Sequence, residues 1–168
     1  KISKKEQVEE GYALCKWGDP GLATFVKEDK QNYKHFRDEL VSESAKRVRE
    51  LPIQPEWVCW IPSFRHKDLV PSFAKRLANE LGLEAVDALQ IAKAKSEQKS
   101  LQNWIQQGRN VDGAFAITEH LQLLNTPVLL VDDIVDSRWT LTMAGWLLRN
   151  NGSGPVVPFV LADAGNFG

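Results

Sequence analysis

The run VLLVDDIVDSRWTLT, residues 128–142, constrains the fold of this chain more than any other segment. Four apolar residues, Val128 to Val131, predict a buried strand, and the acidic pair Asp132 and Asp133 follows directly. A polar turn and a helix from about Thr140 to Arg149 come next. A strand, an acidic turn and a helix in this order are typical of an open α/β sheet, in which ligands bind at the carboxyl ends of the strands.

The turn after this strand carries groups suited to a phosphorylated sugar. Asp136, Ser137 and Thr140 lie in it, and the free N–H groups at the start of a helix attract a phosphate. The carboxylates of Asp132 and Asp133 repel a phosphate, so sugar hydroxyls or a divalent cation suit them better. A phosphorylated ribose meets both requirements.

Three other interpretations of the acidic pair fit less well. A nucleotide hydrolase of the Walker type needs a GxxxxGK[ST] loop, and the chain contains no Gly-Lys pair. A phosphoacceptor receiver domain carries its acidic pair near the start of the domain, not at position 132. A buried strand that ends in a merely solvated acidic turn does not explain why Asp136, Ser137 and Thr140 occur together in the same turn.

The composition is that of an ordinary soluble domain. With 168 residues and 43% apolar side chains, the chain can bury one core, and a net charge of −1 argues against a domain that is basic throughout. Cys15 and Cys59 lack the spacing of metal ligands, which favours a reducing, cytoplasmic setting. No apolar stretch approaches the roughly 18 residues of a membrane span. A first residue other than Met favours a piece cut from a longer protein.

The remaining pattern predicts an N-terminal extension, residues 1–52, followed by an α/β unit, residues 53–168, within one compact molecule. The extension is predicted to contain a hairpin over 12–27, around the turn Gly18-Asp19-Pro20-Gly21, and a helix over 31–50. Strands are predicted at 57–61, 84–91, 114–117, 128–131 and 156–162, and helices at 69–81 and 140–149. Pro158 indicates a sheet edge or a bulge. Strands that alternate with helices predict a parallel sheet.

A second polar turn, residues 62–67, follows the predicted strand 57–61. It should open into the same crevice as the acidic turn, because both follow the carboxyl end of a parallel strand. Ser63 offers a hydroxyl group and Arg65 a planar donor fork suited to phosphate. His66 is expected to face solvent.

The run from Val128 to Thr140 resembles the 5-phosphoribosyl-1-pyrophosphate (PRPP) signature of type I phosphoribosyltransferases. The resemblance implies a parallel sheet flanked by helices, with PRPP as ligand and Mg²⁺ as its cofactor. It implies that Asp132 and Asp133 hold the ribose hydroxyls, directly or through the metal ion. Asp136 matches an aspartate that purine-salvage members use near the base, and it is the candidate catalytic residue. The implied 5′-phosphate loop consists of Asp136, Ser137, Arg138, Trp139 and Thr140.

The loop departs from the family pattern at two positions. The family usually has glycine where this chain has Arg138, and often a small residue or lysine where it has Trp139. Glycine lets the backbone approach a phosphate closely, so the departure bears on loop geometry and turnover.

Two further segments extend the resemblance. In the family, the loop at Ser63, Phe64 and Arg65 holds pyrophosphate. Residues 93–117 are similar to a stretch of ComF-like members, where a flexible loop closes over PRPP. The implied cations of that loop are Lys93, Lys95, Lys99 and Arg109.

The widest similarity is to a domain at the C-terminus of some bacterial RecQ-type DNA helicases. YALCKWGDPG, WVCWIPSFRH and DDIVDSRWT carry it. The helicase motor itself is absent from these residues.

Two hypotheses about function follow. As an enzyme, the domain transfers phosphoribosyl from PRPP to an acceptor base that the sequence does not identify, and pyrophosphate leaves. As a binding module, it senses PRPP or a nucleotide, or holds single-stranded DNA for a parent helicase, with Trp104 and Trp139 as candidates for base stacking. Either form is compatible with a homodimer, and neither involves a membrane.

Overall fold

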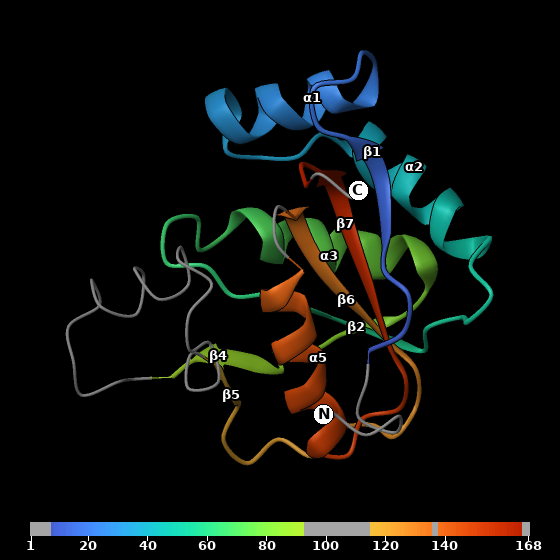
Figure 1. Cartoon of the computed structure of the whole chain (residues 1–168), viewed down its shortest axis with the longest axis vertical. Coiled ribbons are helices and arrows are strands. Elements are labelled where there is room, and N and C mark those ends of the chain that lie inside the picture. Colours follow the sequence, from blue (N-terminus) through green and yellow to red (C-terminus); the bar gives the residue numbers. More distant parts are fainter. Residues whose placement is uncertain (1–7, 93–114, 136–137, 166–168) are drawn as a thin grey trace.

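The computed structural model describes residues 8–92, 115–135 and 138–165 of the chain (Figure 1). The main sheet has five strands in the order β1-β7-β6-β2-β3, and every neighbouring pair is parallel. Its strands are β1 (Tyr12–Lys16), β2 (Trp57–Trp60), β3 (Glu84–Ala85), β6 (Val128–Val135) and β7 (Val156–Asp163). The predicted α/β class, a parallel sheet flanked by helices, is confirmed.

Helices cover both faces of the sheet (Figure 1). The helices α1 (Leu22–Glu28), α2 (Asp38–Arg49) and α3 (Leu69–Leu81) pack on one face, and α5 (Trp139–Asn150) packs on the other. The sheet therefore separates two apolar cores, the first on the side of α1, α2 and α3 and the second on the side of α5. Leu129 and Val131 belong to the first core, whereas Val128 and Leu130 belong to the second. A strand buried on both faces needs apolar residues throughout, which explains the unbroken apolar run at 128–131. None of the helices in the described ranges is long and apolar enough to cross a membrane.

The helices and strands with regular local patterns lie close to their predicted positions. α3 spans the predicted residues 69–81 and buries Phe73, Ala74 and Leu77. Gly82 ends it in the left-handed conformation, with φ of 71°, which glycine adopts without steric cost. α5 and β7 agree with their predicted ranges to within one residue at each end.

The predicted N-terminal hairpin is wrong. The chain turns at Gly18 and Gly21, both at positive φ, but residues 22–28 then form α1, which buries Ala23 and Val26. The strand before the turn, β1, pairs with β7 from the other end of the chain. The run Leu22–Val26 has four apolar or aromatic residues and one threonine. Such a short run fits a strand or one side of a short helix, so the local pattern did not decide between them.

The predicted helix over 31–50 is too long at its start. α2 begins at Asp38, and a π-helical turn, η1 (Asp29–Tyr33), precedes it. Lys34, in the left-handed conformation with φ of 53°, separates the two. The apolar spacing from Tyr33 to Val48 gave no sign of this break, which lies between the hydrogen-bonded residues Asp29 and Arg37.

The predicted strand over 84–91 is two strands in different sheets. β3 is an edge strand of the main sheet, and β4 (Leu89–Ile91) pairs antiparallel with β5 (Phe115–Ile117) in a separate two-stranded sheet. The second core includes Leu89 and Phe115, so this small sheet extends the apolar cover on the α5 side.

The prediction for Pro158 also needs correction. β7 lies inside the sheet, between β1 and β6. The β1 ladder, however, begins only at the Tyr12–Phe159 pair, and Gly11 lies against the Pro158 ring. The missing N–H of the proline therefore falls where β1 has not yet begun to pair.

Gly154 is the basis of a stability prediction. A Cβ at this position would overlap the backbone of Thr126 and Pro127, where the Gly154 N–H donates to the Thr126 carbonyl at 3.1 Å. We expect Gly154→Ala to lower the free energy of unfolding by about 2 kcal/mol, because backbone cannot move aside cheaply. At Gly11 a Cβ meets Pro158 at an ordinary 3.4 Å, so Gly11→Ala should change stability by less than about 1 kcal/mol. Urea unfolding of both variants is the measurement, and equal effects would contradict the prediction.

Candidate ligand-binding cleft

A cleft opens where β2 and β6 part at their carboxyl ends. Their ladder ends at the Trp60–Val131 pair, with a last hydrogen bond from the Ile61 N–H to the Val131 carbonyl at 2.9 Å. The chain then leaves β2 towards α3, whereas β6 continues beside β7 and leads to α5 on the other face. Two neighbouring parallel strands whose connections run to opposite faces form a topological switch point, the usual ligand position in open α/β sheets.

The cleft brings together most of the described residues that the sequence singled out. It has a volume of about 280 Å³. Its lining includes the predicted residues Ser63, Phe64, Arg65, Asp132, Asp133 and Thr140, together with Lys30 and His66. The prediction that the turn at 62–67 shares a crevice with the acidic turn is therefore confirmed for these side chains. Their roles in binding stay predictions.

The two aspartates of the acidic pair are folded back against their own strand. β6 extends through both of them to Val135, so the strand is longer than its apolar run. The Asp133 N–H donates to Oδ1 of Asp132 at 2.8 Å, and the Ile134 N–H donates to Oδ1 of Asp133 at 2.7 Å. Burial, reinforced by the negative charge of Asp133, raises the pKa of Asp132 well above its ordinary value. A cation or a hydroxyl donor in the cleft would relieve this unfavourable charge.

A lysine that the sequence did not single out contacts the acidic pair. Lys30 Nζ lies 2.7 Å from Oδ2 of Asp133, and the two side chains are 28% and 12% exposed. Because both are partly buried, solvent screens this ion pair less than a surface pair. No local pattern identifies Lys30, because 103 positions separate it from its partner.

An ion pair between the buried Asp29 and the partly exposed Arg37 holds the turn that carries Lys30. Asp29 is 2% exposed. It accepts the backbone N–H of Arg37 at 2.8 Å and the Arg37 Nη2 at 2.7 Å. The guanidinium group also lies 3.9 Å from the centroid of the Phe25 ring. Burial alone would raise the pKa of Asp29, but the hydrogen bonds from Arg37 outweigh it and lower the pKa. η1 is thereby tied to the start of α2.

His66 lies in the cleft, contrary to the expectation that it faces solvent. Its backbone N–H lies 3.4 Å from the Ser63 Oγ that accepts it. Burial, followed by the positive charges of Lys34 and Lys30, lowers the pKa of His66. Lys30 and Lys34 therefore both lie near His66, and Lys30 also offsets the charge of the acidic pair.

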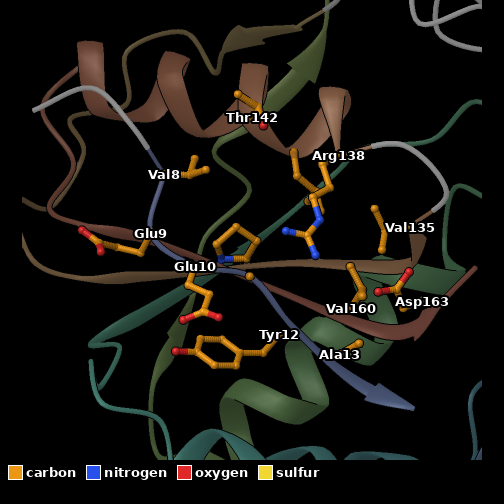
Figure 2. Close-up of a pocket in the computed structure, with 13 residues that line it drawn as sticks. Val8, Glu9, Glu10, Tyr12, Ala13, Val135, Arg138, Thr142, Val160 and Asp163 are labelled. Carbon is orange, nitrogen blue, oxygen red and sulfur yellow. The ribbon is translucent and has the colours of Figure 1, made fainter. Parts of the chain in front are cut away.

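Two residues of the implied 5′-phosphate loop lie elsewhere. Arg138 precedes α5, and its side chain points into a second cleft of about 290 Å³ on the β1 side of the sheet (Figure 2). Glu10, Tyr12 and Asp163 also line that cleft (Figure 2). Trp139 begins α5 and is 44% exposed. The structure therefore does not bring Arg138 together with Asp132 and Asp133.

Several predicted residues lie outside the described ranges. These are Asp136 and Ser137 of the implied phosphate loop, the implied flexible-loop cations Lys93, Lys95, Lys99 and Arg109, and Trp104. Within the described ranges, no group of three or more His, Cys, Asp or Glu side chains is placed to hold a metal ion. The metal ligands predicted from sequence are two, Asp132 and Asp133, and a ligand phosphate would have to complete such a site.

Comparisons with known proteins gave matches among solved structures. A scan of family models and a search of curated proteins returned no match. The chain is similar to adenine phosphoribosyltransferase from Leishmania tarentolae, with 13% identity, 95% of this chain and 84% of that chain covered, and a TM-score of 0.49. It is similar to a hypothetical protein from Neisseria gonorrhoeae with bound ppGpp, with 17% identity, 77% of this chain and 71% of that chain covered, and a TM-score of 0.46. It is also similar to adenine phosphoribosyltransferase from Trypanosoma brucei, with 11% identity, 96% of this chain and 78% of that chain covered, and a TM-score of 0.48.

The Asp29–Arg37 ion pair predicts how the stability difference between the wild type and a variant without Arg37 depends on pH. Because Arg37 lowers the pKa of Asp29, the pair stabilises the wild type above about pH 4 and this contribution is lost as the pH falls further. Arg37→Met leaves the buried Asp29 carboxylate without its partner and should lower the free energy of unfolding near pH 7 more than the loss of a surface ion pair does. In that variant burial alone raises the pKa of Asp29, so the deficit should shrink as the pH falls.

Urea unfolding from pH 3 to pH 8 measures this. Arg47→Met is the control, because Arg47 is 49% exposed and 3.9 Å from Glu50, and it should cost less than about 0.5 kcal/mol. A deficit in Arg37→Met that is constant over the pH range would contradict the assignment.

Proposed function

We propose that the cleft between β2 and β6 binds PRPP and that the domain is of the phosphoribosyltransferase type. The supporting observation is the convergence, in one cleft at a switch point, of Asp132 and Asp133 with the turn of Ser63 and Arg65 and with Thr140. Carboxylates and phosphate-binding groups on opposite walls suit a ligand that carries both hydroxyl and phosphate groups.

Each part of PRPP has a matching wall in this proposal. The 5′-phosphate binds at the start of α5, where Thr140 lines the cleft and the positive end of the helix dipole favours an anion. The ribose hydroxyls donate to Asp132. The pyrophosphate binds the turn of Ser63 and Arg65, where a hydroxyl group and a guanidinium group face the cleft.

Mg²⁺ would meet different surroundings at the two carboxylates of the site. Mg²⁺ favours oxygen ligands and binds one or two carboxylates together with ligand phosphates. Asp132 lines the cleft, and an adjacent cation would favour its charged form. Asp133 already has Lys30 as a partner, so a metal ion there has to compete with an ammonium group. When bound, Mg²⁺ would neutralise the charge on the pyrophosphate.

The reaction is a displacement at the anomeric carbon of the ribose. A bond from an acceptor nitrogen to this carbon forms, the bond to the pyrophosphate oxygen breaks, and the nitrogen loses a proton that Asp136 accepts. Positive charge develops on the sugar and negative charge on the leaving group. Asp132 stabilises the first and Arg65 the second, so that positioning and electrostatics supply the catalysis.

A binding module is the second candidate. The ion pair of Lys30 with Asp133 and the direction of Arg138 into the other cleft (Figure 2) favour a site that binds without turnover. Such a module would sense PRPP or a nucleotide, or hold single-stranded DNA for a helicase, with the 44% exposed Trp139 as a stacking surface.

PRPP titration separates these candidates and tests the site. We expect wild-type protein to bind PRPP more tightly with Mg²⁺ than without it. The double variant Asp132→Asn/Asp133→Asn should weaken Mg²⁺-dependent binding at least roughly tenfold, because it removes the negative charges that the cation needs. Asp87→Asn, which changes an exposed aspartate outside the cleft, should bind as the wild type does. Isothermal titration calorimetry is the measurement. Absence of PRPP binding at millimolar concentrations, with binding of single-stranded DNA, would favour the helicase module instead.

Asp136→Asn tests catalysis apart from binding. If Asp136 accepts the acceptor's proton, this variant should release pyrophosphate about 10²- to 10⁴-fold more slowly while largely keeping PRPP affinity. The measurement is a pyrophosphate-release assay with a panel of purine and pyrimidine bases. No release by the wild type with any base, despite PRPP binding, would assign the domain to the sensing class.

A further inference from the structure

The N-terminal segment supplies a charged group to the cleft. η1 is tied down by the Asp29–Arg37 ion pair, and the next residue, Lys30, reaches across to Asp133 at 2.7 Å. The Lys30 side chain is 28% exposed, and Lys30 lines the cleft. Lys30 therefore lies between a carboxylate and the space for a ligand.

The charge of Asp133 is balanced by Lys30 in the free protein, and a cation that binds Asp133 would disturb this balance. In the free protein Lys30 neutralises Asp133, whose other oxygen accepts the Ile134 N–H. A divalent cation at Asp133 and the ammonium group of Lys30 would repel each other at contact distance. The ammonium group then needs a new anionic partner, and a ligand phosphate in the same cleft is the nearest candidate.

We propose that Lys30 exchanges partners when the site is filled: it holds Asp133 in the free protein, gives up that carboxylate to the divalent cation, and then contacts a phosphate group of the ligand. The inference rests on the proposed function for the nature of the ligand. Cation and phosphate binding become coupled through one side chain, because each makes the other more favourable. Lys30 thus weakens binding of the cation alone and favours binding of the cation and the phosphate together.

Binding of Mn²⁺ alone tests the first half of the exchange. Mn²⁺ prefers the same oxygen ligands as Mg²⁺. Lys30→Gln removes the competing ammonium group and should tighten Mn²⁺ binding roughly tenfold, the equivalent of one charge-assisted hydrogen bond. Lys30→Arg keeps the charge and should bind Mn²⁺ as weakly as the wild type. Lys27→Gln is the matched control, because it removes an exposed lysine three residues earlier and should change the affinity less than about twofold.

Coupling with PRPP tests the second half. The factor by which Mn²⁺ tightens PRPP binding should be about tenfold smaller in Lys30→Gln than in the wild type, since the released ammonium group is missing. Equal factors in the two proteins would overturn the contact with phosphate. Equal Mn²⁺ affinities, or no Mn²⁺ binding to either protein, would overturn the competition for Asp133.

A measurement on wild-type side chains guards against variants that fail to fold. Lysines methylated with ¹³C-formaldehyde keep their charge, and the Lys30 signal is identified by its absence in Lys30→Arg. Addition of Mg²⁺ should shift the Lys30 signal and leave that of Lys27 in place; an unmoved Lys30 signal would contradict the exchange. If Mn²⁺ competition is observed but no PRPP binds, the proposed function fails while the competition at Asp133 stands.

Discussion

The parallel pairing of β2 with β6 is the constraint on which the rest of this structure depends. Both strands lie inside the sheet, and their ladder ends at Trp60 and Val131. Because the chain leaves β2 for one face and β6 for the other, the sheet opens at that point. The same divergence places the turn of Ser63 and the carboxylates of Asp132 and Asp133 on two walls of one cleft.

The electrostatics of the cleft follow from this geometry. Two adjacent carboxylates at a buried strand end are costly, and their own backbone N–H groups offset only part of that cost. The fold offsets a further part from the N-terminal segment, where the Asp29–Arg37 ion pair holds η1 and Lys30 contacts Asp133. The N-terminal segment, which the sequence suggested to be an extension, thus contributes to the charge balance of the site.

The local patterns were sufficient to predict helices with one buried face and strands that are buried on both faces of the sheet. α3, α5 and β7 were predicted closely, because helical spacing, a C-terminal glycine and apolar runs are local signals. The hairpin was wrong and the strand over 84–91 was two strands, because pairing partners of β1 and β4 come from distant parts of the chain. Pro158 was misplaced at an edge for the same reason: whether its missing N–H matters depends on where β1 begins to pair.

By itself the sequence determined the α/β class and the position of the acidic pair at a strand end. It also determined the likeness of two turns to phosphate-binding loops, because strand, turn and helix signals are written within a few adjacent residues. Only the tertiary structure decided that Lys30 and His66 enter the cleft and that Arg138 points into a different one. These placements depend on where η1, the turn between β2 and α3, and the start of α5 lie relative to the end of β6. Charge contacts between residues more than a hundred positions apart leave no periodic trace in the chain.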